Sequence, residues 1–226
     1  RIADQSGLDR MNEICRIKGR AGVGLLSALP VIDKRYGLPG LAEDVDSGRW
    51  IEADVKTPQG YTVTVVCVYV HAGNTDDPEK MKQKYRFLDT MLVRMGQLRD
   101  EAAHGGKQAV LCGDFNIAHT PLDIKNAKAN EKHAGFLPEE RAYVDKWLGE
   151  LEFVDVMRSL CGDIQGPYTW WSQRGRAFDN NVGWRIDYQF ATPELAETAR
   201  GFVIDKAPTY DLRWSDHAPL SITYDV

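Results

Sequence analysis

The sequence has few of the features that mark membrane or secreted proteins. No apolar run approaches the ~20 residues of a membrane-spanning helix, and the mean hydropathy is −0.41. Residues 1–20 contain no apolar core of the kind found in signal peptides. Only four cysteines occur in 226 residues, and none forms a CxxC pair for zinc or redox chemistry. We therefore expect no membrane partner and a reducing, cytoplasmic location.

Strong positive charge is also absent. The net charge of −5 argues against a broadly basic surface that coats nucleic acid. It leaves room for a basic rim around an acidic, metal-binding centre. The length, with 43% hydrophobic and 27% charged residues, predicts one domain over residues 1–226 with a sizeable core, and we expect a monomer.

The hydrophobic pattern predicts many strands and two good helices, whereas residues 1–20 show no clear period. One helix begins near Pro78 and ends before Gly105, and the second begins near Pro138. A turn at 58–60 predicts a hairpin. These elements together indicate a sheet sandwich with helices outside. Strands are predicted at 21–29, 50–55, 61–70, 109–112, 168–171, 185–192, 201–204 and 218–224.

The stretch LCGDFN at 111–116 marks the point where a short buried strand ends in polar residues. Because side chains alternate along a strand, Asp114 and Asn116 project to one side while Phe115 packs inward. Ligand sites favour the carboxyl ends of strands. An aspartate after a strand is also commonly a turn former or helix cap, so this stretch alone is weak evidence.

Two later stretches strengthen the case for a site. GWRIDY at 183–188 places Asp187 opposite Ile186 and Tyr188, and WSDHAP at 214–219 supplies Asp216 and His217. A single strand-end aspartate or histidine is usually structural. Three such stretches fit phosphodiester hydrolysis, which needs an oriented water, charge neutralisation and help for the leaving oxygen. Carboxylates can also hold Mg²⁺.

The motifs resemble the exonuclease III group of apurinic/apyrimidinic endonucleases, in the endonuclease/exonuclease/phosphatase superfamily. The resemblance covers residues 18–226, and the aromatic stretch ending in GWRIDY points to this group in particular. The matching stretches are GDFNIAHTPLDIKN at 113–126, GFLPEER at 135–141, YTWWSQRGRAFDNNVGWRIDY at 168–188 and WSDHAPLSI at 214–222, with weaker matches such as KYRFLD at 84–89.

The resemblance implies an α/β (α+β) fold, a four-layered sandwich of two mixed β-sheets flanked by helices. It implies a Mg²⁺-dependent DNA-repair nuclease, with Mn²⁺ as an alternative ion. The expected substrate is double-stranded DNA with abasic sites, cleaved 5′ to the lesion, or with 3′ ends that are trimmed.

The resemblance also implies residue roles. Asp114 would activate the attacking water and Asn116 would position it. His217 would contact the phosphate, with Asp187 orienting the imidazole. Two further roles, a metal ligand and a tyrosine near the phosphate or leaving group, fall on Asp216 and Tyr69.

DNA contacts are expected from two loops. Lys125, Asn126 and Asn130 are candidates for phosphate contacts, with a solvated polar loop as the alternative. In the aromatic loop, Phe178 and Trp184 are the expected recognition residues, whereas Trp170 or Trp171 is expected in the core. Two arginines could hold phosphates or remain solvated: Arg174 and Arg176.

The family's N-terminal asparagine and its LQE motif, whose glutamate binds metal, are not found. Glu13 follows no predicted strand, and we assign it no such role. We therefore expect an N-terminally incomplete domain. Two alternatives stay open: a catalytically silent DNA-binding relative, and a phosphodiesterase or phosphatase that acts on a small phosphorylated molecule.

Overall fold

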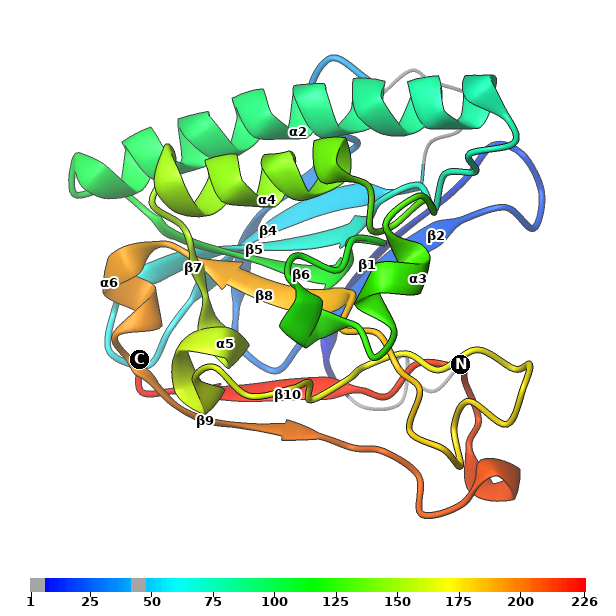
Figure 1. The fold of residues 1–226 in the computed structure, drawn as a ribbon. Coiled ribbons are helices and arrows are strands. Elements are labelled where there is room, and N and C mark those ends of the chain that lie inside the picture. Colours follow the sequence, from blue (N-terminus) through cyan, green and yellow to red (C-terminus); the bar gives the residue numbers. More distant parts are fainter. Residues whose placement is uncertain (1–6, 42–47) are drawn as a thin grey trace.

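A six-stranded mixed sheet forms the centre of the protein (Figure 1). The computed structural model describes residues 7–41 and 48–226. The strand order is β3-β4-β5-β6-β8-β7, in which only β5 and β6 run parallel. The bounds are Val31–Tyr36 for β3, Trp50–Lys56 for β4, Thr62–Tyr69 for β5, Gln108–Asp114 for β6, Asp187–Ala191 for β8 and Val154–Asp155 for β7.

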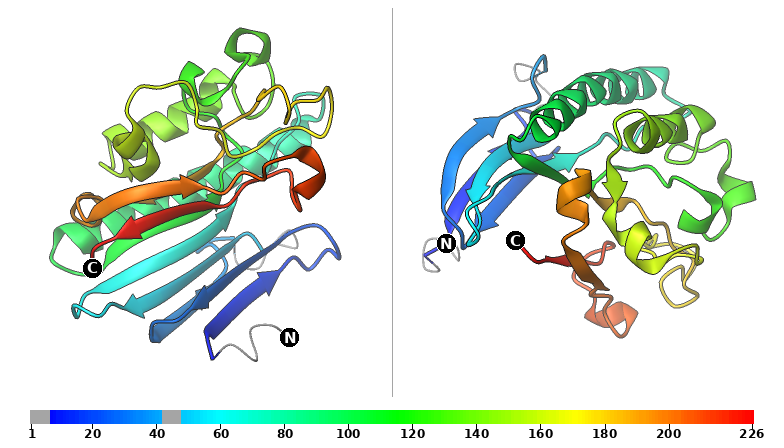
Figure 2. Two further views of the ribbon diagram at one scale, coloured as in Figure 1. Left: turned by 90° about the horizontal axis from the view of Figure 1, so that it is seen from below. Right: turned by 90° about the vertical axis from the view of Figure 1, so that its left-hand side faces the viewer.

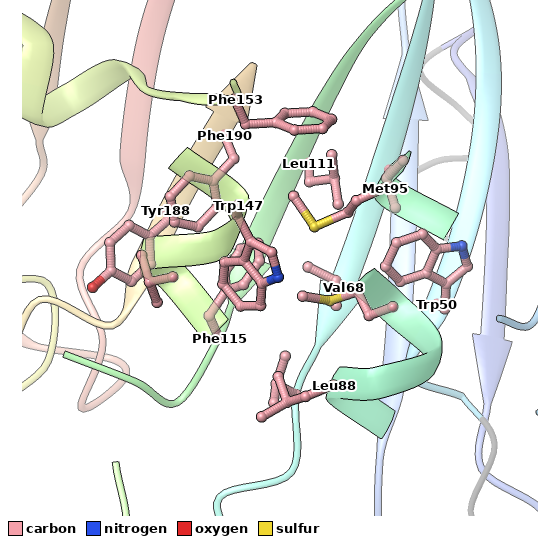
Figure 3. Close-up of a cluster of buried hydrophobic side chains, with 14 of the residues drawn as sticks. Trp50, Val68, Leu88, Met95, Leu111, Phe115, Trp147, Phe153, Tyr188 and Phe190 are labelled. Atoms are coloured by element: carbon pink, nitrogen blue, oxygen red, sulfur yellow. The ribbon is translucent and has the colours of Figure 1, made fainter. Parts of the chain in front are cut away.

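Helices α2 (Pro78–Ala103) and α4 (Pro138–Gly149) cover one face of this sheet (Figures 1 and 2). The Asp77 side chain caps α2 by accepting a hydrogen bond from the Lys80 N–H, and Pro78 occupies the first turn. Beneath the two helices lies the main hydrophobic core (Figure 3), in which the Phe190 ring packs edge to face against Phe115 and Trp147. This core holds the carboxyl end of β6 in place.

The other face of the sheet carries two separate two-stranded ladders. The alternation along β4 explains the division, because Trp50 joins the helix-side core while Ile51 and Ala53 pack against Met11 and Val23 of the first ladder. Among the described residues the two ladders share no strand pairing with each other. They consist of β1 (Asp9–Ile14) with β2 (Gly22–Ser27), and β9 (Ala199–Ile204) with β10 (Leu220–Tyr224).

The expected α/β class, a mixed sheet flanked by helices, is confirmed, as are both long helices and the hairpin at 58–60. The strands differ in detail. Strands β1 and β3 were not predicted, because both are mostly exposed and carry no regular apolar alternation. Residues 168–171 form isolated bridges from Trp170 to Trp184 and His217 in place of a strand. The remaining short helices are α3 (Ala127–Asn130), α5 (Val156–Cys161), α6 (Pro193–Ala196), η1 (Pro121–Asp123) and η2 (Tyr210–Leu212).

No helix in residues 7–41 and 48–226 has the length and apolar composition needed to cross a bilayer.

We predict that Trp147→Ala lowers the free energy of unfolding by about 3–5 kcal/mol, because it removes a fully buried ring from the main core. Val93→Ala is the control, since Val93 is 64% exposed on α2 and should change stability by about 0.5 kcal/mol or less. Denaturant unfolding of both variants measures the difference. Equal losses would mean that the Trp147 ring is not a core residue.

Candidate active site

The site begins where β6 ends, at a glycine that no other residue can replace without strain. Gly113 has φ +144°, and an added Cβ would lie 1.9 Å from the Val68 carbonyl oxygen of β5. The chain then buries Phe115, whose N–H donates to the Ile186 carbonyl at 2.8 Å. The next residue, Asn116, has φ 50°, an unusual conformation for a residue other than glycine.

Asp114 and Asn116 form a closed pair. The Asn116 N–H donates to Asp114 Oδ1 at 2.8 Å, and Asn116 Nδ2 donates to Asp114 Oδ2 at 3.0 Å and to the Val70 carbonyl at 2.9 Å. Both amide hydrogens are thereby used. The amide oxygen of Asn116 is therefore the group that can hold a water or a substrate oxygen.

A second pair lies beside the first. Asp187 begins β8 and is the register partner of Asp114 across the antiparallel β6–β8 ladder. His217 Nδ1 lies 2.9 Å from Asp187 Oδ2 and 3.1 Å from Oδ1, so this nitrogen is bound to the carboxylate. The other ring nitrogen, Nε2, lies 3.9 Å from Asp114 Oδ2. The two pairs together form one polar cluster.

The electrostatics of this cluster suit acid–base chemistry near neutral pH. Burial, together with the charge of Asp187, raises the pKa of Asp114 to about 7, although His217 and the Asn116 N–H oppose the shift. Burial would lower the pKa of His217, but the hydrogen bond and charge of Asp187 outweigh it and raise the pKa to about 9. Asp114 can therefore accept a proton near pH 7 while His217 stays cationic.

A cavity of about 720 Å³ opens over these groups. Trp170, which was expected to be a core candidate, lines it, and no predicted role pointed to Ser172 or His133. The predicted residues that share the cavity are Tyr69, Asp114, Asn116, Asn130, Arg174, Trp184, Asp216 and His217.

The other predicted DNA-contact residues lie outside this cavity. Lys125 and Asn126 are exposed on the neighbouring loop. Arg176 is exposed and lies 3.5 Å from Asp179 Oδ2. Phe178 corrects an expectation, because its ring is only 5% exposed and packs against Trp171. Its ring cannot contact DNA as an exposed recognition residue without leaving this cluster.

Asp216 is the predicted metal ligand that lies at the cavity. Trp170 Nε1 donates to Asp216 Oδ2 at 3.0 Å, which leaves Oδ1 available. In the part of the chain that the structure describes, no three His, Cys, Asp or Glu side chains come together as a metal site. Mg²⁺ commonly uses one or two carboxylates, several waters and substrate phosphates. The residues therefore fit a loosely held Mg²⁺ that substrate would help to bind.

Glu13 lies within β1, which corrects the expectation that no strand carries it. Burial raises the pKa of its carboxyl group, although the backbone at Gly37 and Gly48 opposes the shift, and its buried Oε2 has no hydrogen-bond partner among the described residues. Glu13 does not line the cavity, and we assign it no part in the site.

A buried ion pair binds the backbone of loops that line the cavity. Lys84 of α2 and Glu140 of α4 are both fully buried, with Lys84 Nζ 2.5 Å from Glu140 Oε1. Lys84 Nζ also donates to the Asn116 carbonyl at 2.9 Å, while Glu140 Oε2 accepts the N–H groups of Gly135 and Leu137. The motifs KYRFLD and GFLPEER contain these residues, but their sequence gave no sign that they meet.

A strand-end carboxylate and amide that face an Asp–His pair define a hydrolytic site on an α/β sandwich. Residues 7–217 match the model of the Endonuclease/Exonuclease/phosphatase family, and the chain belongs to this family. It is 32% identical over 209 residues to an exodeoxyribonuclease of Bacillus subtilis (strain 168). This alignment covers 92% of this chain and 76% of the relative.

Solved structures of related enzymes have the same fold. An AP endonuclease from Archaeoglobus fulgidus matches with a TM-score of 0.85 and 31% identity, over 99% of this chain and 82% of that chain. A 3′ phosphatase from Neisseria, solved with a product DNA hairpin, matches with a TM-score of 0.84 and 27% identity, over 100% of this chain and 82% of that chain. These findings confirm the resemblance to the exonuclease and AP-endonuclease branch, and the chain is an enzyme of this type.

We predict that Asp187→Ala and His217→Ala are non-additive in their effect on kcat/KM. If Asp187 acts through the imidazole that it holds, the double variant should be no worse than the poorer single variant. Steady-state kinetics of the three variants on one substrate test this. Losses that add in free energy would show that the two residues act independently.

We also predict that Lys84→Met destabilises the protein by about 3–5 kcal/mol, because it leaves the buried Glu140 carboxylate without its partner. Lys82→Met is the control on the same helix, since its side chain is 77% exposed. Adding Glu140→Gln to Lys84→Met should recover part of the loss by removing the stranded charge. Equal denaturation midpoints for the two lysine variants would contradict this role.

Proposed function

We propose that the protein is a Mg²⁺-dependent DNA-repair phosphodiesterase that cleaves 5′ to abasic sites and trims 3′ ends. The observation that carries the proposal is that Asp114, whose pKa is raised to about 7, and a cationic His217 lie beside each other in the lining of one cavity. The exodeoxyribonuclease, AP endonuclease and 3′ phosphatase names of the relatives support DNA as the substrate. We further propose that the enzyme acts as a monomer.

In this proposal His217 binds the scissile phosphate through Nε2, because Nδ1 is held by Asp187. The Asn116 amide oxygen and Asp114 hold the attacking water, and Asp114 takes its proton as the water oxygen bonds to phosphorus. The bond from phosphorus to the leaving oxygen then breaks, and the Tyr69 hydroxyl at the cavity wall can donate to that oxygen. The cationic imidazole stabilises the charge that develops on the phosphate.

Enzymes of this family generally depend on divalent metal ions, and Asp216 is the residue that would hold one at the cavity. A bound Mg²⁺ would supply further charge neutralisation to the phosphate oxygens. Mn²⁺ offers similar oxygen-ligand chemistry and is the alternative ion.

DNA would be held by groups around the cavity. Asn130, Arg174 and Trp184 line it directly, and a ring such as that of Trp184 suits the face of an extrahelical sugar. Lys125, Asn126 and Arg176 lie outside the cavity on exposed loops, where backbone phosphates farther along a duplex could reach them.

We predict that Asp114→Asn lowers kcat on an abasic duplex by about 100-fold or more while the affinity for DNA changes little, because it removes the proton acceptor. Asp225→Asn is the control, since this carboxylate is 64% exposed at the C-terminal end of the chain. Cleavage assays with Mg²⁺ at low salt, beside binding measurements, give both numbers. Retention of more than about a tenth of the activity would overturn the role of Asp114.

The same assay separates the alternatives. A catalytically silent relative would bind the abasic duplex without cleaving it at any Mg²⁺ concentration. An enzyme for small molecules would hydrolyse a phosphorylated inositol or lipid headgroup in preference to the duplex.

A further inference from the structure

Trp214 is 84% exposed, more than any other large apolar side chain among the described residues. It lies two residues before Asp216 and three before His217 in sequence. Leu212 and Tyr210, which are 67% and 40% exposed, precede it on the same turn. Single exposed apolar residues are ordinary, but three within five residues, close in sequence to Asp216 and His217, indicate a contact surface. The proposed reaction steps use none of these three side chains.

The turn that carries Trp214 is tethered to the core. Arg213 Nη1 donates to the Trp171 carbonyl at 3.3 Å, and its guanidinium lies 4.0 Å from the centre of the Tyr210 ring. On the other side, the Ser215 hydroxyl accepts the His217 N–H at 3.1 Å, and the Asp216 carbonyl accepts the Trp171 N–H. The indole is therefore presented from an anchored segment, which lowers the entropy lost when it makes a contact.

Trp214 lines a second hollow of about 320 Å³, to which Asp187 and His217 also contribute. His217 lines the main cavity as well, so it stands between the two hollows. A phosphate bound at His217 thus has the Asn116 and Trp184 side of the site in one direction and the indole in the other. Trp214 is positioned to meet a nucleotide that adjoins the phosphate under attack.

We propose that Trp214 stacks on a nucleobase next to the scissile phosphate, an assignment that rests on the proposed function. An exposed indole offers a flat apolar face, and stacking on a base suits it because every base has such a face. Positive charge near Trp214 suits a polyanionic ligand, since Arg213 directly precedes Trp214 and Arg174 lines the main cavity. A frayed or unpaired base at a 3′ end would be the most accessible partner.

The experiment measures DNA affinity in an Asp114→Asn background, so that cleavage does not interfere. Fluorescence anisotropy at low salt compares two labelled duplexes with a frayed 3′ end, one with bases in the frayed nucleotides and one with abasic residues there. Trp214→Ala should weaken binding of the first by about 5- to 140-fold, the equivalent of stacking at about 1–3 kcal/mol per base. It should leave the second nearly unchanged.

Trp214→Phe should recover most of the affinity, because the phenyl ring still stacks. Tyr61→Ala is the matched control, an exposed aromatic residue (57%) on the β4–β5 turn far from the cluster in sequence. Thermal unfolding of each variant should be unchanged, because Trp214 covers no core. An equal loss on both duplexes, or no loss on either, would overturn the stacking role.

Two outcomes separate this inference from the proposed function. If the unmodified enzyme cleaves abasic DNA while Trp214→Ala keeps its affinity and KM, the stacking role is wrong and the proposed function stands. If the protein neither binds nor cleaves DNA, both are wrong. A shift from dimer to monomer in analytical ultracentrifugation of Trp214→Ala would instead assign this surface to a second copy of the chain.

Discussion

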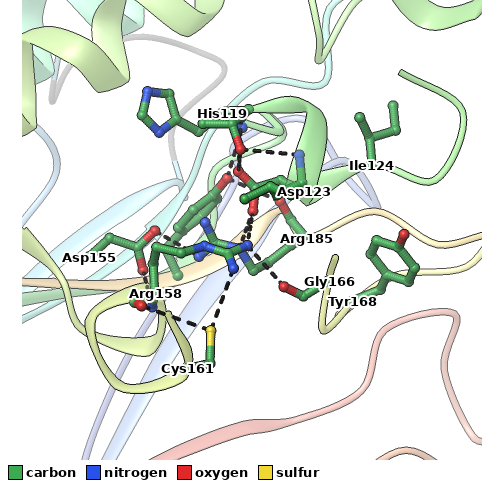
Figure 4. A network of polar contacts seen from close by, with 12 residues as sticks. His119, Asp123, Ile124, Asp155, Arg158, Cys161, Gly166, Tyr168 and Arg185 are labelled. Atoms are coloured by element: carbon green, nitrogen blue, oxygen red, sulfur yellow. Dashed lines mark hydrogen bonds and ion pairs between the residues drawn. The ribbon is translucent and has the colours of Figure 1, made fainter. Parts of the chain in front are cut away.

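The burial of one guanidinium determines how the site is assembled. Arg185 is fully buried two residues before Asp187, and a buried charge is tolerated only when it is paired and hydrogen-bonded (Figure 4). Its Nε donates to Asp123 Oδ1 at 2.7 Å, its Nη1 lies 2.7 Å from Asp155 Oδ2, and Arg158 also binds Asp123. The loop after β6, the start of α5 and the entry to β8 are thereby joined, so Asp114 and Asp187 approach from segments fixed to one ion network.

A second buried ion pair joins separate segments on the side of the sheet that the helices cover. Lys84 and Glu140 hold the Asn116 carbonyl and the loop at Gly135 and Leu137 to helices α2 and α4. Asn116 has a positive φ, which costs free energy and persists only where the surroundings impose it. The carbonyl contact to Lys84 and the amide contacts to Asp114 together supply that constraint. Both networks replace water around buried charges with fixed partners, and both contact residues beside the cluster of Asp114, Asp187 and His217.

The positions of the candidate residues at strand ends could be predicted from the sequence, because alternation places Asp114, Asn116 and Asp187 on known sides of their strands. The motif resemblance supplied the link to His217. Burial of single aromatics could not be predicted in the same way, since Phe178 is covered by Trp171 and Tyr210, which lie on separate segments. Strands β1 and β3 were missed for a related reason, because β1 pairs only with β2 and β3 is the edge strand of the main sheet, and both are mostly exposed and show little apolar pattern. The Lys84–Glu140 and Arg185 networks likewise depend on tertiary proximity.

The charged groups of the candidate site impose a further condition on the fold. Asp114 and Asp187 are register partners on adjacent strands, so their carboxylates repel, and the charge of Asp187 helps to raise the pKa of Asp114. His217 offsets this repulsion, yet it belongs to the segment that leads into β10 in the second layer. The main sheet itself contributes the two like charges, whereas the cations that lower the pKa of Asp114 come from the segment before β10 (His217) and from α2 (Lys84). Docking of the β9–β10 ladder brings His217 to this pair, which couples the assembly of the second layer to the protonation states that the proposed hydrolysis uses.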